Sequence, residues 1–176
     1  MSWSIAIHTA AASEPVSTDE AKRQCRLEED DTSAELATYI AGSRATIETW
    51  LNRGALITQT LDLTATEQSD VDQLPIYPVQ SITSITDASA ADASSLFTQA
   101  LGGKYPSLKF IGTTWPGTIT IRAVCGFGIA TAVPADIKLA CLFLVSALYD
   151  NRGELPPNVF DTLDQILVGW RRPAMM

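Results

Sequence analysis

The side chains that most often carry acid–base or nucleophilic chemistry are sparse in this sequence. His8 is the only histidine, and it lies close to the N-terminus. Catalytic triads and dyads that use histidine place it beside a nucleophile. Ser43 occurs in AGSRA, which lacks the G-x-S-x-G pattern of a nucleophile elbow. We interpret His8 as an arm residue without a catalytic role, and the sequence predicts no catalytic residue.

Two acidic stretches have the residue types of a cation site. One runs from Glu28 to Asp31, and the other is Asp70-Val71-Asp72. Hard cations need several oxygen ligands that converge from a shaped loop, and neither stretch has the glycine or the terminal glutamate of an EF-hand. We therefore interpret both stretches as solvated charge at helix junctions and predict no metal site.

The three cysteines are odd in number, far apart and without a C-x-x-C pair. Zinc sites usually show such pairs at short spacing, so zinc is not expected. Cys125 falls in an apparent strand and Cys141 in a strongly apolar segment. Together with Cys25 they are expected to be free, buried and reduced thiols in a cytosolic protein.

A glycine-rich segment, Gly126-Phe127-Gly128, has the context of a phosphate-binding loop because it follows a predicted strand and precedes a predicted helix. The third glycine of G-x-G-x-x-G is absent, since Thr131 occupies its position, and there is no G-K-[ST] sequence. The next helix also begins late, at Pro134. The segment therefore does not predict a nucleotide site, and no cofactor is expected.

The C-terminal segment combines an aromatic and two basic residues, Trp170-Arg171-Arg172. Such residues can stack on and grip nucleic acid, but the chain carries a net charge of −8. Arg and Trp also dominate protein–protein hot spots, so docking on an acidic or aromatic protein groove is favoured over nucleic acid. A frayed tail without function is the other interpretation. The candidate docking residues are Leu163, Leu167, Trp170, Arg171 and Arg172.

The best-defined element in the sequence is a helix expected from Pro134 to Gly153. Proline suits the first helical turn, Asp136 and Arg152 lie near the helix ends whose dipole they complement, and glycine can close a helix in the left-handed conformation. One face carries Ile137, Cys141, Leu144 and Leu148. The other carries Leu139, Leu142 and Phe143.

A helix that is apolar almost all round is buried between layers or lies against a second subunit. We therefore predict Leu139, Leu142 and Phe143 as candidate subunit-interface residues. The apolar run from Leu139 to Tyr149 is far shorter than the roughly 20 residues that a membrane span needs. No membrane partner is expected.

Other helix signals flank a β-rich region. Ser17 and Glu20 have the spacing of a capping box, as do Thr32 and Glu35. The second of these helices is expected to end at Arg53-Gly54 and to pack on the helix that follows Pro134. A last amphipathic helix is expected over 158–170, with Val159, Leu163, Ile166, Leu167 and Trp170. We predict helices over about 18–28, 33–53 and 134–152, and then this C-terminal helix.

The residues between 56 and 125 show a period of two, which indicates strands. Alternation is clear around Ile57 to Leu63 and from Thr118 to Cys125. Residues 87–99 are rich in small side chains and are expected to form a mobile loop, with a short turn at Leu96-Phe97. In the N-terminal arm, residues 1–15, Trp3, Ile5 and Ile7 alternate with small residues. That pattern predicts a strand on its own domain or on a neighbour's sheet edge.

The fold class predicted is α+β, a small bundle of about four helices with an inserted β-rich excursion of four to five short strands. Residues 1–156 are expected to form one domain and residues 157–176 a C-terminal helix and docking tail. With 176 residues the chain can bury a core without disulfides. Its net charge of −8 and pI near 4.5 argue against non-specific DNA binding. The N-terminus lacks the positive and apolar regions of a signal peptide.

Several phrases, in this order, resemble the head–tail connector or head-completion adaptor proteins of tailed phages and gene transfer agents. EPVS at Glu14 to Ser17 leads to a short helix, and an acidic junction follows at Glu28 to Asp31. A long helix then ends in the phrase from Arg53 to Thr60. The later phrases are LPIYPVQSITSIT, from 74 to 86, and GFGIATAVPADIKLACLFLVSALYDNRGE, from 126 to 154.

The resemblance implies a structural role without catalysis. It implies a ring of subunits, typically twelve, seated under the portal at the capsid vertex and bridging it to the next neck or tail component, a stopper or tail terminator. DNA would pass through the lumen without specific binding. The protein would be located in the virion neck, and in the host cytoplasm during assembly. The alternatives from the residues alone are a free-standing oligomeric binding or regulatory protein, or an enzyme of unrecognised type.

Overall fold

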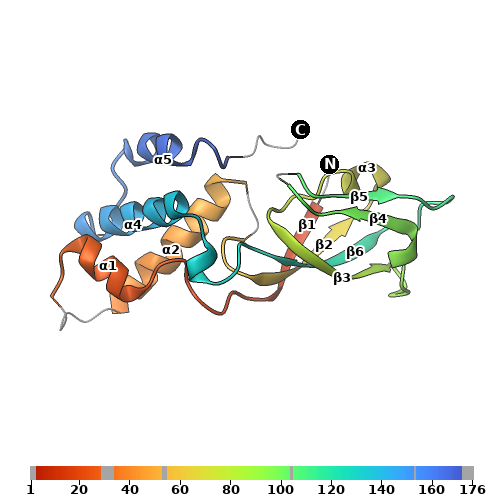
Figure 1. The fold of residues 1–176 in the computed structure, drawn as a ribbon, viewed down its shortest axis with the longest axis horizontal. Helices are drawn as coiled ribbons and strands as arrows, with labels where there is room; N and C mark the ends of the chain where they lie inside the picture. Colours follow the sequence, from red (N-terminus) through yellow and green to blue (C-terminus); the bar gives the residue numbers. More distant parts are fainter. Residues whose placement is uncertain (1–2, 29–33, 53–54, 104, 153, 172–176) are drawn as a thin grey trace. The chain divides into compact units, whose positions relative to one another are not determined.

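The computed structural model describes residues 3–28, 34–52, 55–103, 105–152 and 154–171. Contacts divide these residues into two compact units. The helical unit comprises residues 13–52 and 128–171, and the sheet unit comprises residues 3–12 and 55–127. The chain therefore enters and leaves the helical unit around an inserted β-rich excursion, as the sequence predicts (Figure 1).

The helical unit contains α1 (Thr18–Cys25), α2 (Ala34–Trp50), α4 (Ala135–Asp150) and α5 (Val159–Leu167). The central helix is α4, which contacts the other three (Figure 1). Its packing on α2 confirms the sequence prediction. One stripe of α4 is fully buried: Ile137, Ala140, Cys141, Leu144 and Val145.

Local side-chain chemistry explains where these helices begin and end. Ser17 N–H donates to Glu20 Oε2 at 2.7 Å and Glu20 N–H donates to Ser17 Oγ at 3.1 Å, which confirms the first capping box. Helix α4 begins one residue after Pro134, and Asp136 lies in its first turn. At its end Arg152 takes a left-handed φ of 54°.

Three predicted helix-end signals lie outside the described residues. They are the second capping box, which needs Thr32, the Arg53-Gly54 stop signal and the closing Gly153.

The sheet unit is built on a four-stranded antiparallel sheet with the order β1-β2-β6-β3. These strands are β1 (Trp3–Thr9), β2 (Gln59–Ala65), β6 (Ile119–Cys125) and β3 (Val79–Asp87). The two central strands alternate strictly between buried and half-buried residues, because every second side chain points to the same face. Leu63 lies opposite Ile121, and Asp62 lies opposite Arg122 on the other face.

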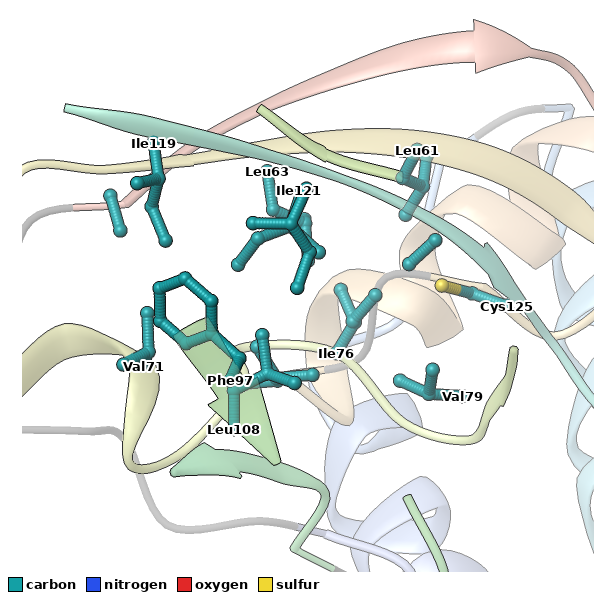
Figure 2. Close-up of a cluster of buried hydrophobic side chains, with 14 of the residues drawn as sticks. Leu61, Leu63, Val71, Ile76, Val79, Phe97, Leu108, Ile119, Ile121 and Cys125 are labelled. Carbon is teal, nitrogen blue, oxygen red and sulfur yellow. The ribbon is translucent and has the colours of Figure 1, made fainter. Parts of the chain in front are cut away.

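A hairpin of β4 (Phe97–Ala100) and β5 (Ser107–Phe110) covers the apolar face together with the short helix α3 (Gln68–Val71). Figure 2 shows Phe97 and Leu108 directed toward Leu63, Ile119 and Ile121 of the sheet. The rings of Phe97, Phe110 and Trp115 pack on one another with centroids 5.3–5.9 Å apart. Together with the buried side chains of the sheet, these residues form the hydrophobic core of the sheet unit.

The segment 87–99 is more structured than its composition predicts, and the expectation of a loop with little to bury is wrong. Asp87 accepts hydrogen bonds from the backbone of Ser89 and Ala91, which folds the chain into a tight turn. A short 3-10 helix, η1 (Ser94–Leu96), then leads into β4, and Phe97 is only 7% exposed. Ala93 and Phe97 thus anchor this stretch of small side chains to the core of the sheet unit.

The N-terminal arm forms the edge strand β1, which pairs with β2 of its own chain. Ile5 and Ile7 lie opposite the buried Leu63 and Leu61, yet they are 48% and 66% exposed. Their alternation correctly predicts a strand. Their exposure reflects the position of β1 at the edge of the sheet.

Candidate assembly site

His8, the only histidine of the sequence, lies in a cluster of charged side chains that links neighbouring strands. His8 Nδ1 lies 3.6 Å from Asp62 Oδ2, and Arg122 donates to both oxygens of Asp62 at 2.8 and 2.9 Å. The side-chain hydrogen bond from Arg122 lowers the pKa of the Asp62 carboxyl. This cluster joins the polar face of three neighbouring strands, β1, β2 and β6.

The predicted acidic stretches have separate positions. Asp70 is buried in the first turn of α3, and its Oδ2 accepts a hydrogen bond from Glu67 N–H at 3.3 Å. Glu28 is exposed, whereas Glu29 to Asp31 lie outside the described residues. In the described part of the chain no group of three or more His, Cys, Asp or Glu could hold a metal ion. In the same part no helix is long and apolar enough to cross a membrane.

The glycine-rich segment has a structural explanation. Gly126 has a φ of +110°, and a Cβ atom there would lie 2.4 Å from the carbonyl oxygen of Ile57. Gly126 N–H donates to Pro78 O and Phe127 N–H donates to Leu56 O, each at 2.9 Å. The glycine therefore permits two backbone segments to cross closely.

The cysteines are free, and two of them are buried. Desolvation by burial raises the pKa of both Cys125 and Cys141 to about 12. Cys25 is half-buried, and desolvation raises its pKa as well. Since the thiolate is the reactive form, these environments suppress thiol chemistry at neutral pH.

The start of the helical unit gives a physical role to the EPVS phrase. Arg44 Nε donates to Glu14 Oε2 at 2.7 Å, Val16 is 2% exposed, and Ser17 caps α1. Lys138 of α4 adds an ion pair with Glu20 at 2.9 Å. A groove of about 690 Å³ is lined in part by Glu14, Ser17 and Lys138. The phrase thus fixes the place where the arm joins the helical unit.

A network of side-chain contacts holds α5 on the helical unit. We define the α5 socket as the surface of α2 and α4 that α5 covers. The side chains of Val159, Leu163 and Leu167 are at most 3% exposed, and α5 packs on α4. Burying an aliphatic side chain of this size contributes about 1.5–3 kcal/mol. Burial of these three side chains therefore stabilises the packing of α5 on its socket.

Polar contacts orient α5 on the socket. Trp50 Nε1 of α2 donates to Asp164 Oδ1 at 3.0 Å, and the rings of Trp50 and Phe160 lie 4.9 Å apart. Arg171 donates to Asp164 at 3.1 Å, and its guanidinium carbon lies 4.8 Å from the centroid of the Trp50 ring. Trp170 Nε1 donates to Asp136 Oδ2 in the first turn of α4.

The predicted docking residues are therefore already in contact with the helical unit. Leu163 and Leu167 are buried, Trp170 is half-buried and Arg171 is exposed. Arg172 lies outside the described residues. The sequence identified the apolar and aromatic residues of this segment. It did not identify the side-chain contacts of Trp50, Asp136 and Asp164, because these contacts join different elements of the chain.

The predicted subunit-interface residues lie on the side of α4 away from its buried stripe. Leu139 is 52% exposed, and Leu142 and Phe143 are half-buried. At 100° per residue, Leu139 lies almost opposite the buried stripe. We call Leu139, Leu142 and Phe143 the outer face of α4. Helix α4 thus buries one face on three helices and still exposes an apolar side chain.

Comparisons with known proteins agree with this architecture. The family described as "HCP: Head completion protein" matches residues 15–153. A chain in "Neck of empty GTA particle computed with C6 symmetry" is 23% identical, with a TM-score of 0.81, over 98% of this chain and 97% of that chain. A chain in "Virion of native gene transfer agent (GTA) particle" is 21% identical, with a TM-score of 0.78, over 98% and 97%.

A third chain, in "Neck of native GTA particle computed with C12 symmetry", is 22% identical, with a TM-score of 0.70, over 97% and 98% of the two chains. No curated protein matches the chain by sequence. The family match spans most of the sequence, from the EPVS phrase through α4, and it confirms the resemblance drawn from the ordered phrases. The chain belongs to the head completion protein family.

Proposed function

We propose that this protein is a head–tail connector subunit that forms a ring in the virion neck beneath the portal. The observation that carries the proposal is the family match over residues 15–153, which includes the sheet unit apart from β1 and the helical unit apart from α5. The similar chains in necks described with C6 and C12 symmetry support a ring. Twelve subunits is the stoichiometry that we propose. Such a ring would assemble in the host cytoplasm and remain in the particle.

The ring would bridge the portal to the next neck component, a stopper or tail terminator. DNA would pass through its lumen without specific binding. A net charge of −8 supports this, because a protein that grips DNA needs Lys and Arg to displace counterions from phosphates. We propose no catalytic step and no cofactor for this role.

We propose the outer face of α4 as a contact between subunits. Exposed apolar side chains on a helix that already packs on three others are suited to a further protein contact. Leu139 is the most exposed of the three side chains. The C-terminal segment, residues 157–176, is the second proposed contact and would dock on the portal or on a neighbouring subunit.

The test is to measure the mass of the purified protein with and without portal-containing capsids, and to image those capsids by electron microscopy. We expect a ring of density beneath the portal when the protein is added. A stable oligomer that forms alone and does not bind the capsids would indicate a free-standing binding protein instead. A monomer that never binds them would also contradict the proposal.

A further inference from the structure

Strand β1 is an edge strand that lacks the usual protection against further pairing. On its outer side it has no partner strand among the described residues, and it pairs regularly with β2 from Trp3 to Ile7. Proteins protect such edges with Lys or Pro, with bulges or with a covering segment. The sequence of β1, WSIAIHT, has no Lys or Pro, its residues 4–9 are exposed, and its one irregularity lies between Ile7 and Thr9. The edge is therefore open to an added strand.

The opposite edge of the same sheet, β3, is protected in two ways. Its pairing with β6 has two register shifts within residues 79–84, and such bulges bend a strand and disrupt its ladder. Beyond them the chain covers the edge itself, since Ala93 N–H donates to Ile85 O at 2.9 Å and Thr86 forms a bridge with Asp92. Of the two edges of this sheet, β1 is thus the one open to an added strand.

The side chains of β1 show what an added strand would contact. Ile5 and Ile7 lie opposite Leu63 and Leu61, and directly opposite residues point to the same face of a sheet. Leu63 and Leu61 are buried, whereas Ile5 and Ile7 are 48% and 66% exposed, so the covering hairpin leaves them in water. A strand with apolar residues at alternate positions would cover both isoleucines.

Trp3, at the start of β1, adds a polar requirement. Its ring packs on the core of the sheet unit, but its indole N–H is buried and has no hydrogen-bond partner among the described residues. Buried polar groups are nearly always hydrogen-bonded in folded proteins. A polar side chain on the added strand, beside Trp3, would supply the acceptor. The edge therefore fits an extended segment with one polar and two apolar residues on the same face.

Three observations favour a different protein over a second copy of the chain as the occupant of this edge. Pairing β1 with β1 of another copy makes a two-fold contact, which closes as a dimer and does not propagate around a ring. Pairing with a neighbour's β3 is disfavoured because that edge is irregular and covered. The family match, residues 15–153, begins after β1, whereas a ring contact common to the family is expected within the matched residues.

We propose that β1 binds an extended segment of the next neck component, a stopper or tail terminator, as a fifth strand of the sheet. This inference rests on the proposed function. The other end of the chain, with α5, belongs to the helical unit and is the proposed contact with the portal or a neighbouring subunit. The sheet unit therefore remains available for the next component. Main-chain hydrogen bonds along β1 give affinity, and the contacts with Ile5 and Ile7 select the sequence of the segment.

The experiment adds two lysines to one face of β1 or to the other and follows two assembly steps. Ile5→Lys with Ile7→Lys changes the apolar face. Ser4→Lys with Ala6→Lys is the matched control, because these exposed residues lie on the polar face of the same strand and the added charge is equal. Each protein is added to portal-containing capsids and then to purified tails that carry the next neck component. Electron microscopy counts the capsids with a ring and the capsids joined to a tail.

We expect the Ile5–Ile7 variant to form rings as the unmodified protein does and to lose tail joining, while the control pair joins tails normally. Normal joining by the Ile5–Ile7 variant would overturn the proposal, as would equal loss with both pairs or loss of the ring itself. Absence of any ring from the unmodified protein would instead defeat the proposed function, and the inference with it. The two failures are therefore distinguishable.

A second measurement keeps both isoleucines, so it does not depend on the folding of the lysine variants. Ser4→Cys in a Cys25→Ser background carries a benzophenone-maleimide, and Cys125 and Cys141 stay unreactive because burial raises their pKa to about 12. Light then joins β1 to its neighbour in tailed particles, and mass spectrometry identifies the peptide. We expect a segment of the next neck component with apolar residues at alternate positions. A cross-link to the portal, to a second copy or to residues 172–176, or no cross-link to another protein, would overturn the proposal.

Discussion

Gly126 is the residue whose identity is most strongly constrained in the sheet unit. Its φ of +110° is unfavourable for any other residue, and a Cβ atom would lie 2.4 Å from Ile57 O. We expect Gly126→Ala to lower the free energy of unfolding by more than about 1 kcal/mol. Urea unfolding of the purified protein measures this change through the midpoint.

The matched control is Gly42→Ala in α2, where a Cβ atom meets nothing within 4 Å. Alanine is favoured over glycine in a helix by about 1 kcal/mol, so this variant should be more stable than the original protein. Equal effects of the two substitutions would show that the crossing at Gly126 does not constrain the fold.

Glu20 gives the helical unit a pH dependence. The Ser17 backbone N–H and then Lys138 hold the pKa of the Glu20 carboxyl below its ordinary value of 4.5. Because the folded-state pKa is lower than the unfolded one, this contribution is complete above the unfolded pKa and is lost as pH falls through the folded pKa. We expect the melting temperature to fall below about pH 5, and to fall less in Glu20→Gln.

Glutamine preserves the capping-box hydrogen bond, so the variant isolates the charge. Asp161→Asn, at an exposed position of α5, serves as the comparison and should retain the full pH dependence. If Glu20→Gln retains it too, the acid sensitivity of the protein comes from other carboxylates.

At the scale of elements, α5 is a structural part of the helical unit as well as a proposed contact. Leu163 is fully buried, so Leu163→Ala should lower the free energy of unfolding by about 2–5 kcal/mol. Val168→Ala, at a side chain that is 77% exposed, should change it by no more than about 0.5 kcal/mol. Chemical denaturation of both variants compares the two values. Similar small effects would mean that α5 does not pack on α4 in solution.

Because α5 packs on α4, a truncation that removes α5 cannot test portal docking by itself. Removing everything after Pro156 would uncover the apolar surface that Val159, Leu163 and Leu167 bury. Such a protein would expose the socket, so loss of portal binding would not separate docking from misfolding. Point substitutions at exposed residues avoid this ambiguity.

The sequence predicted elements well where local chemistry determines them. The Ser17–Glu20 box, the apolar stripe of α4 and the alternation of β6 are each encoded within about 20 residues and correspond to observed elements. What the sequence did not predict depends on distant contacts. The pairing of Trp50 with Asp164 joins positions more than a hundred residues apart, and no local pattern records it.

Burial was less predictable than element type. Ile5 and Ile7 alternate as core residues do, but they are exposed because β1 is the last strand of its sheet. Conversely, Phe97 stands in a segment of small residues and is buried because the β4–β5 hairpin folds over the sheet. The position of β1 in the strand order explains the first outcome, and the covering hairpin explains the second. Period-two alternation has the same form in an edge strand and a central one.

At the scale of the whole molecule, a connector subunit must stay folded alone and still present surfaces to its neighbours. In the helical unit, the two faces of α4 serve these two requirements. Its inner stripe is fully buried and holds the unit together, while Leu139 on its outer face is 52% exposed. A single apolar residue contributes little to protomer stability at that exposure, because only the area removed from water counts.

A substitution at Leu139 should therefore affect ring assembly without affecting the stability of the single subunit. We expect Leu139→Lys to leave the melting temperature of the free protein nearly unchanged, since lysine is a good helix former and the site is half exposed. In a ring, the same ammonium would be buried without a partner at every contact between subunits, which is strongly unfavourable. We therefore expect the variant to lose ring formation on portal-containing capsids, measured by electron microscopy and native mass.

The comparison is Ile129→Lys, which also places lysine at an exposed apolar site of the helical unit, in the segment that leads into α4. It should assemble normally, because Ile129 lies outside both proposed contacts, the outer face of α4 and residues 157–176. If Leu139→Lys also forms complete rings, the subunits meet through surfaces other than the outer face of α4. If both variants fail to assemble while remaining folded, the interface is wider than that face and includes the segment before α4.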